Sequence, residues 1–237
     1  MMDFHSHILP EMDDGSRSPE MSRDMLEMMT EQKIDAVIAT PHFYADNEAP
    51  EEFLRRRAEA VKRLGAILRP GMPRVLLGAE VAFFTGISRS PQIESLCVLG
   101  TKILLVEMPF DRWSEPVISE LFMLRSRRGL IPVVAHIERY MEDQPRGIEN
   151  RLTEQGILLQ SNAAAFLERR SARHALRMFQ RKQVLLLGSD AHNTTTRAPN
   201  LGEAVALLEE KAPKAFVCAC RFSEILLRGA QPVSGGN

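Results

Sequence analysis

Short runs of apolar residues alternate along the chain with longer stretches that mix apolar and polar positions at a helical period. The runs consist mostly of Val, Ile and Leu without strict alternation, which is typical of strands buried on both faces of a parallel sheet. Seven segments fit this description: residues 3–7, 34–40, 74–81, 102–110, 130–140, 156–166 and 183–192. The mixed stretches predict helices at residues 19–33, 50–68, 115–128, 171–182, 201–211 and 214–227.

The repeated order of strand and then helix predicts an α/β fold, namely a β/α barrel. The chain has 237 residues, of which 44% are hydrophobic, and this suits one domain of that architecture. We expect a single domain at residues 1–230 and a disordered tail, "QPVSGGN", at residues 231–237.

Polar and ionisable residues stand at the end of each predicted strand. In a β/α barrel these strand ends meet around one pocket on the active face. His5 and His7 are two residues apart on one strand, so both side chains can reach the same ion, and Asp190 and His192 repeat this spacing. Five of the six histidines fall at such ends, together with several carboxylates. The set is His5, His7, His42, His136 and His192, with Glu80, Glu107, Glu138 and Asp190.

Any one of these histidines could simply form a hydrogen bond with a loop at the barrel rim. For a single histidine, that structural interpretation is at least as good as a role as metal ligand. It fails for the whole set, because crowding imidazoles and carboxylates without a cation costs desolvation and repulsion. Mixed nitrogen and oxygen donors favour Mn, Fe or Zn over Ca or Mg. His174, by contrast, lies on a predicted helix, and we expect no role for it.

The net charge, the length of the apolar runs and the cysteine count exclude several classes of function. The formal net charge of −1 gives no general attraction to nucleic acid or anionic lipid. No apolar run approaches the roughly 20 residues that a membrane span needs, and no leader pattern precedes Asp3. Three cysteines without disulfide spacing agree with a reducing compartment, so we expect a cytoplasmic protein that is not inserted in a membrane.

The segments "DFHSHILPEMDDG", "TPHF", "GAE", "VEMPF", "AHIERY" and "SDAHN" resemble, in this order, the motifs of the PHP (polymerase and histidinol phosphatase) superfamily. More narrowly, they resemble its bacterial manganese-dependent protein-tyrosine phosphatases of capsule operons, the CpsB/CapC/YwqE type. The resemblance implies a distorted TIM-like (β/α)7 barrel with three divalent ions, Mn²⁺ before Fe or Zn. By resemblance, His5, His7, Glu80 and Asp190 hold one ion, Glu80, Glu107 and His136 a second, and Asp14, His42 and His192 a third.

The resemblance also implies that Arg139 and Arg197 clamp the phosphate, for which a planar guanidinium is well suited. Asp13, Asn162 and Glu138 are weaker candidates, which we expect to support ligands or loops. Three divalent ions and four carboxylates leave about +2 in the site, which matches a phosphate monoester dianion. The expected activity is therefore hydrolysis of phosphotyrosine by a metal-activated hydroxide. By resemblance alone, the expected substrate is the tail of a bacterial tyrosine autokinase that controls capsule or exopolysaccharide synthesis.

Three alternatives compete with this function. A cysteine-based phosphatase needs a loop in which an arginine follows the cysteine by six residues, and none of the three cysteines has one. A small-molecule phosphomonoesterase, such as histidinol phosphatase, keeps the same chemistry and stays open. A metal-binding module without turnover is the third alternative, although the complete set of expected ligands argues against it.

Overall fold

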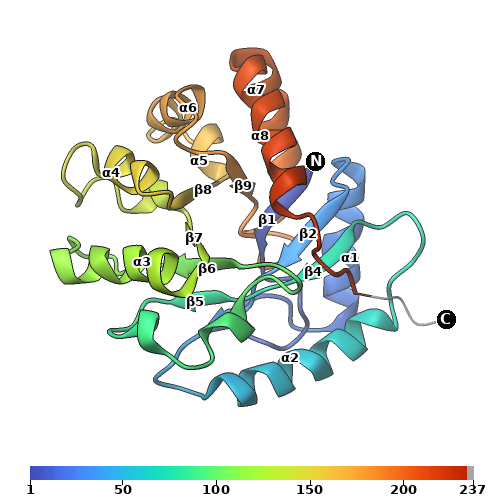
Figure 1. The fold of residues 1–237 in the computed structure, drawn as a ribbon. Coiled ribbons are helices and arrows are strands. Elements are labelled where there is room, and N and C mark those ends of the chain that lie inside the picture. Colours follow the sequence, from blue (N-terminus) through green and yellow to red (C-terminus); the bar gives the residue numbers. More distant parts are fainter. Residues whose placement is uncertain (234–237) are drawn as a thin grey trace.

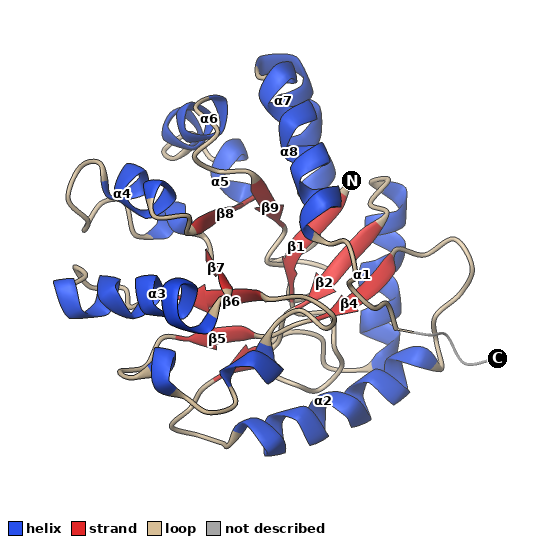
Figure 2. Cartoon of the chain, in the orientation of Figure 1, coloured by secondary structure: helices blue, strands red, loops and turns tan. Residues whose placement is uncertain are grey.

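A computed structural model describes residues 1–233 of the chain. Its strands gather at the centre and its helices surround them (Figures 1 and 2). The nine strands are β1 (Met2–Ser6), β2 (Ala36–Ala39), β3 (His42–Phe43), β4 (Arg74–Leu77), β5 (Glu80–Ala82), β6 (Ile103–Glu107), β7 (Ile131–Val134), β8 (Leu158–Asn162) and β9 (Leu186–Gly188). The helices are α1 (Pro19–Glu31), α2 (Pro50–Gly65), α3 (Glu115–Arg128), α4 (Ile148–Glu154), α5 (Ala164–Leu167), α6 (Ala172–Gln180), α7 (Leu201–Lys211) and α8 (Pro213–Leu226).

The nine strands occupy seven strand positions of a curled parallel barrel, because two of these positions each hold two short strands in succession. Each position is called a crossing below. The pair β2 and β3 is separated only by Thr40 and Pro41, and β4 and β5 only by Gly78 and Ala79. All strand pairs are parallel, in the orders β1-β2-β4 and β3-β5-β6-β7-β8-β9. A parallel bridge between Ser6 and Ala191 joins the last crossing to the first. The predicted seven-stranded β/α architecture is confirmed.

The barrel is irregular at its third β/α unit. After β5 the chain forms two 3₁₀ turns, at Ile87–Arg89 and Ile93–Leu96, in place of an α-helix. The other units carry helices, and two short ones, α4 and α5, were not predicted. Helix α5 falls in a segment predicted as strand, because its run Ala-Ala-Phe-Leu has no period that separates a strand from a buried helix.

Apolar side chains pack on both sides of the curled sheet. A large cluster joins strands to the helices around them, with Met25 and Leu26 of α1, Leu64 of α2 and Leu121 of α3 fully buried. A smaller cluster consists mostly of strand residues; its members include Phe4, Ile38, Leu76, Leu105, Val133 and Leu186. With both faces covered, the strands are buried as their unbroken apolar sequences predict.

The end of the described chain returns to the sheet. Gln231 donates its backbone N–H to Leu99, and Val233 donates to Val75, at 3.1 and 2.8 Å. The predicted tail therefore begins with three residues that contact the barrel, and residues 234–237 lie outside the described part. Within residues 1–233, no helix is both long and apolar enough to cross a membrane.

Candidate metal centre

The polar residues singled out in the sequence meet at the carboxyl ends of the parallel strands. His5 and His7 lie on and just after β1, His42 begins β3, Glu80 begins β5, and Glu107 ends β6. His136 follows β7, and Asp190 and His192 follow β9, while Asp13 and Asp14 lie in the loop after β1. All of these except Asp14, His42 and Glu107 are buried or nearly so. The fold thus concentrates imidazoles and carboxylates at one end of the barrel.

Glu80 stands at the middle of this cluster. Its Oε2 lies 3.1 Å from His5 Nε2, 3.3 Å from His7 Nε2 and 3.0 Å from His42 Nδ1. Its other oxygen, Oε1, lies 3.0 Å from His136 Nε2. One fully buried carboxylate therefore faces four imidazole rings, a position that suits a ligand shared by two ions.

Three smaller groups of donor atoms can be separated within the cluster. In each, the ligand atoms lie within 4.8 Å of one another: His5 with His7 and Asp190; His42 with Glu80 and Glu107; and His7 with Asp14, His42 and His192. The partition expected from the family resemblance differs in detail, since there His42 serves only with Asp14 and His192. His136 belongs to none of these three groups, although its Nε2 is 3.5 Å from Glu107 Oε1. The structure brings the nine expected ligands together, and their roles as ligands stay predictions.

The residues present fit divalent ions by a further criterion. Four buried ligand atoms of the cluster make no well-formed hydrogen bond: His42 Nδ1, Glu80 Oε2, His136 Nδ1 and His192 Nε2. The first two lie only 3.0 Å apart, but without hydrogen-bond geometry. A buried polar atom without a partner costs free energy, about 1–3 kcal/mol each. Their concentration among imidazoles and carboxylates indicates that something outside the protein chain completes these contacts, and a cation is the group that such donors bind.

The charges of the cluster lead to the same conclusion. Burial raises the pKa of Glu80, but the His5 charge and the adjacent imidazoles of His136 and His42 outweigh it and hold that pKa well below its usual range. Burial likewise lowers the pKa of His136, but hydrogen bonds with Glu107 and Glu80 raise it to about 9. Glu80 therefore stays ionised and needs positive charge beside it, which protons on histidine provide when no metal does.

Backbone strain is located at two of the expected ligands. His136 and Asp190 adopt left-handed conformations, with φ of 31° and 52°, which are unfavourable for residues other than glycine. Two glycines allow the close packing around the first strand. A Cβ at Gly15 would lie 2.3 Å from the His7 carbonyl oxygen, and one at Gly188 would lie 2.6 Å from His5 Cβ. Both glycines leave room for the histidines that they contact.

Arg139 and Arg197 converge on one carboxylate at the edge of the cluster. Their Nη2 atoms lie 2.8 and 3.0 Å from Asp190 Oδ2, and each side chain is 39% exposed. Arg197 Nη1 is also 3.6 Å from Asp14 Oδ2. Two guanidinium groups held beside the donor cluster, and still open to solvent, form a site suited to an incoming oxyanion.

The chain is similar to known proteins over most of its length. The family model for capsular polysaccharide synthesis proteins CpsB/CapC matches residues 1–224. The chain belongs to the CpsB/CapC family. The family membership expected from the motifs is therefore confirmed.

Individual members of the CpsB/CapC family agree. The chain is 31% identical to the tyrosine-protein phosphatase YwqE of Bacillus subtilis, over 89% of this chain and 85% of the relative. It is 27% identical to the tyrosine-protein phosphatase CpsB of Streptococcus agalactiae, over 92% and 95%.

Solved structures give the same result. The crystal structures described as YwqE from Bacillus subtilis and CpsB from Streptococcus pneumoniae, "unique metal-dependent tyrosine phosphatases", match with a TM-score of 0.79 and 26% identity over the whole of both chains. A D-hydantoinase, at 11% identity and a TM-score of 0.52 over 90% of this chain and 66% of its own, shares the fold alone.

Several side chains in this CpsB/CapC site hold the expected ligands in place. Asp13 accepts a hydrogen bond from His7 Nδ1 at 2.7 Å and from the His42 backbone N–H at 2.9 Å. Asn162 donates to Asp190 Oδ2 at 2.9 Å, and Glu138 accepts from the Asn162 backbone. These positions agree with the supporting roles expected for Asp13, Asn162 and Glu138.

Gln160 was not singled out in the sequence, yet it connects two candidate ligands. Its Oε1 lies 3.3 Å from His5 Nδ1 and accepts the His136 backbone N–H at 2.7 Å, while its Nε2 donates to Asn162 Oδ1. A signal was available, because Gln160 and Asn162 share the i, i+2 spacing of the strand-end histidines. Asp3 is a second such residue: it accepts backbone N–H groups of His5 and Ser189.

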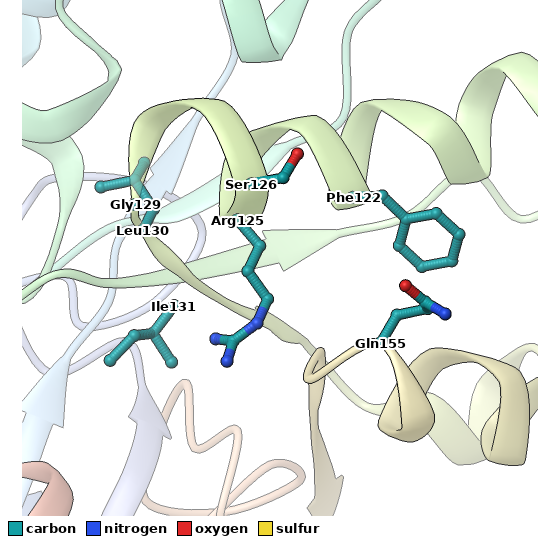
Figure 3. Close-up of a pocket in the computed structure, with 7 residues that line it drawn as sticks. All are labelled: Phe122, Arg125, Ser126, Gly129, Leu130, Ile131 and Gln155. Atoms are coloured by element: carbon teal, nitrogen blue, oxygen red, sulfur yellow. The ribbon is translucent and has the colours of Figure 1, made fainter.

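Two cavities lie at opposite ends of the barrel. One of about 500 Å³ adjoins the cluster and is lined by Met12, Asp13, Asp14, His42, Tyr44, Asn47, Glu48, Glu52 and Arg56. Another of about 520 Å³ lies between the end of α3 and the start of β7, lined by residues that include Phe122, Arg125, Leu130 and Gln155 (Figure 3). It lies at the amino end of β7 and contains no carboxylate or imidazole, so it belongs to the opposite end of the barrel.

Proposed function

We propose that this chain is a metal-dependent protein-tyrosine phosphatase, a phosphoric monoester hydrolase that hydrolyses phosphotyrosine. The observation that carries the proposal is the cluster around Glu80, in which buried nitrogen and oxygen donors lack partners within the protein. The activity itself is that of YwqE and CpsB, the tyrosine-protein phosphatases that the chain resembles over most of its length.

In this proposal the site holds three divalent ions, and Mn²⁺ is the native choice. His5, His7, Glu80 and Asp190 hold the first, Glu80, Glu107 and His136 the second, and Asp14, His42 and His192 the third. The distances support Glu80 as the shared ligand, since its two oxygens face different histidines at 3.0–3.3 Å. When bound, such ions lower the pKa of coordinated water and neutralise phosphate oxygens.

The side chains of the protein then bind and orient the phosphate. Arg139 and Arg197 are each 39% exposed and contact Asp190 through one nitrogen, so in this proposal their other N–H groups donate to phosphate oxygens while that ion pair is kept. Four ionised ligand carboxylates against three divalent ions leave about +2, which matches a phosphate dianion. Phenolate, with a conjugate pKa near 10, leaves with less help from a proton donor than an alkoxide needs, so no dedicated general acid is assigned.

The protein substrate in this proposal is the tyrosine-rich tail of a bacterial tyrosine autokinase that controls capsule or exopolysaccharide synthesis. The family description, capsular polysaccharide synthesis, supports this choice. We place the reaction in the cytoplasm, because three cysteines without disulfide spacing favour a reducing compartment.

Phosphate release from a phosphotyrosine peptide tests the proposal directly. The purified chain is stripped with EDTA, Mn²⁺ is added back, and a phosphoserine peptide of the same sequence serves as the matched control. We expect release from the phosphotyrosine peptide alone, lost with EDTA and restored by Mn²⁺. Turnover of histidinol phosphate but of neither peptide would identify a metabolic phosphatase instead, and no turnover of any phosphomonoester would leave a metal-binding module.

A further inference from the structure

Two exposed aromatic rings border the metal centre, and neither has a role in what is described above. Tyr44 is 41% exposed and Phe110 is 56% exposed. They are the only aromatic side chains among the large hydrophobic residues exposed in residues 1–233. Exposing a phenylalanine forgoes the free energy of burying it, about 1.5–3 kcal/mol, so its position beside a polar site calls for an explanation.

Both rings lie against imidazoles of the cluster. The Phe110 ring is nearly parallel to that of His136, at an interplanar angle of 12° and a centroid distance of 6.1 Å. The Tyr44 ring lies 5.3 Å from that of His42 at 29°. Between them, the imidazoles of His42, His7, His5 and His136 follow one another at centroid distances of 4.6, 5.2 and 5.7 Å. Tyr44 and Phe110 therefore end a continuous row of rings that passes along the metal centre.

Buried neighbours fix Phe110 in place despite its exposure. Its ring lies 5.3 Å from that of Tyr140, which in turn lies 5.1 Å from Trp113. Tyr140 is fully buried, and its hydroxyl accepts the backbone N–H of Met108. Gln144 accepts the backbone N–H of Trp113 and donates to the Asp111 carbonyl. These two bonds hold the loop that follows Phe110 in the sequence. The exposed ring is thus oriented before any ligand arrives.

Tyr44 borders the cavity next to the cluster. It lines this space of about 500 Å³ together with Asp14 and His42, two of the expected ligands. On the other side, Phe110 faces His136, whose Nε2 lies 3.5 Å from Glu107 Oε1. The two aromatic side chains therefore flank the cluster of expected ligands, each beside a different histidine.

We propose that Phe110 and Tyr44 are the walls of an aryl-binding subsite, which receives the ring of the phosphorylated side chain and selects phosphotyrosine over phosphoserine. This rests on the proposed phosphatase activity and specifies how its substrate is chosen. In this proposal, Arg139 and Arg197 hold the phosphate, and the ester group points toward the exposed rings, whose faces favour an aryl group over an alkyl chain. Offset or edge contacts between aromatic rings add about 0.5–1.5 kcal/mol beyond the area they bury.

Leucine substitutions at the two positions test the proposal. Phe110→Leu and Tyr44→Leu are compared with the wild type on phenyl phosphate and on glycerol phosphate, with Mn²⁺ content measured for each protein. We expect each substitution to lower the ratio of kcat/KM for the aryl over the alkyl ester about fivefold, mainly through KM, and the double variant to lower it further. Phe110→Tyr and Tyr44→Phe keep the rings and should retain the ratio.

A remote exposed residue provides the matched control. Leu99 is 42% exposed and lies near the described end of the chain, so Leu99→Ala should leave both rates unchanged. An unchanged aryl-to-alkyl ratio in the leucine variants, with full metal content, would overturn the subsite. Equal losses on both esters together with loss of metal would also overturn it, because the rings would then only support the ligands. Absence of turnover in the wild type would instead refute the proposed function.

Discussion

The two ends of the barrel are built from the same strands but differ in the chemistry of their side chains. At the carboxyl ends, His5, Glu80 and His136 are buried polar residues whose donor atoms lack partners or crowd one another. At the amino ends, the cavity beside α3 contains a single charged side chain, Arg125, and its wall is formed partly by Leu130 and Ile131 (Figure 3). Cavities of nearly equal volume therefore differ in their chemistry, and the donor set rather than the size of the space identifies the site.

Backbone strain does not separate the two ends. His136 and Asp190, at the carboxyl ends, adopt left-handed backbone conformations, but so do Lys33 and Lys182, shortly before β2 and β9. The amino ends are also covered by residues Gln231–Val233, which pair with the backbone there. What distinguishes the carboxyl ends is therefore their set of buried imidazoles and carboxylates, whose atoms without partners a bound cation can satisfy.

Removing the charge of Glu80 should have the largest effect. Glu80→Gln keeps the shape of the carboxylate but removes the charge that faces four histidines. We therefore expect bound Mn²⁺ to fall from the proposed three ions to less than one ion per protein molecule. We expect kcat/KM on a phosphotyrosine peptide to fall by more than about a hundredfold. This exceeds the loss of activity expected when only a residue that hydrogen-bonds to a metal ligand is replaced. Glu120→Gln is the matched control, since Glu120 is also buried but bonds the Ser88 backbone away from the cluster. Equal losses in both variants would contradict a special role for Glu80.

Removal of Arg139 should come next. Arg139→Ala removes a charge-assisted contact to phosphate, worth about 1.5–3 kcal/mol, so we expect kcat/KM to fall about thirtyfold. Mn²⁺ content should remain at the wild-type value, because Arg197 and Asn162 still contact Asp190. The control is Arg170→Ala, in which an exposed ion pair with Glu142 is lost and no change is expected. Metal loss in Arg139→Ala would show that the arginine supports a ligand instead of clamping phosphate.

A smaller effect is expected where a side chain acts through a ligand. Asp13→Asn weakens the hydrogen bond that orients His7 through Nδ1, so the affinity for Mn²⁺ should fall about tenfold, as measured by metal titration. Activity at saturating Mn²⁺ should recover most of its wild-type value. Asp24→Asn, which alters an exposed ion pair with Arg23, is the control. Undiminished affinity in Asp13→Asn would show that His7 is positioned by packing alone.

The smallest effect should arise at the opposite end of the barrel. Arg125→Ala enlarges the cavity beside α3, which lacks the donors of the metal centre, so kcat/KM and Mn²⁺ content should each stay within about twofold of wild type. Steady-state kinetics and metal analysis check this. A large loss of activity would mean that the cavity beside α3 influences the metal centre at the opposite end of the barrel, which we do not expect.

The sequence alone determined the order of strands and helices and the kinds of donor atoms at the strand ends. Apolar runs and helical periods are local signals, and they located α3 and α7 at their observed bounds and β1 within a residue or two. The motifs also identified the CpsB/CapC family. Local pattern gave no warning of the two 3₁₀ turns after β5 or of α5, because there the deciding contacts come from distant residues.

Only the tertiary structure decided how the polar residues meet. That Glu80 faces four imidazoles, that Gln160 joins His5 to His136, and that Tyr44 and Phe110 end a row of rings are facts about residues on different strands and loops, as far apart in sequence as His5 and Gln160. A sequence can place a side chain at the end of a strand, since alternation along the strand fixes its face. It cannot give the distance between the ends of different strands, because barrel closure sets that distance through the register of every pair between them.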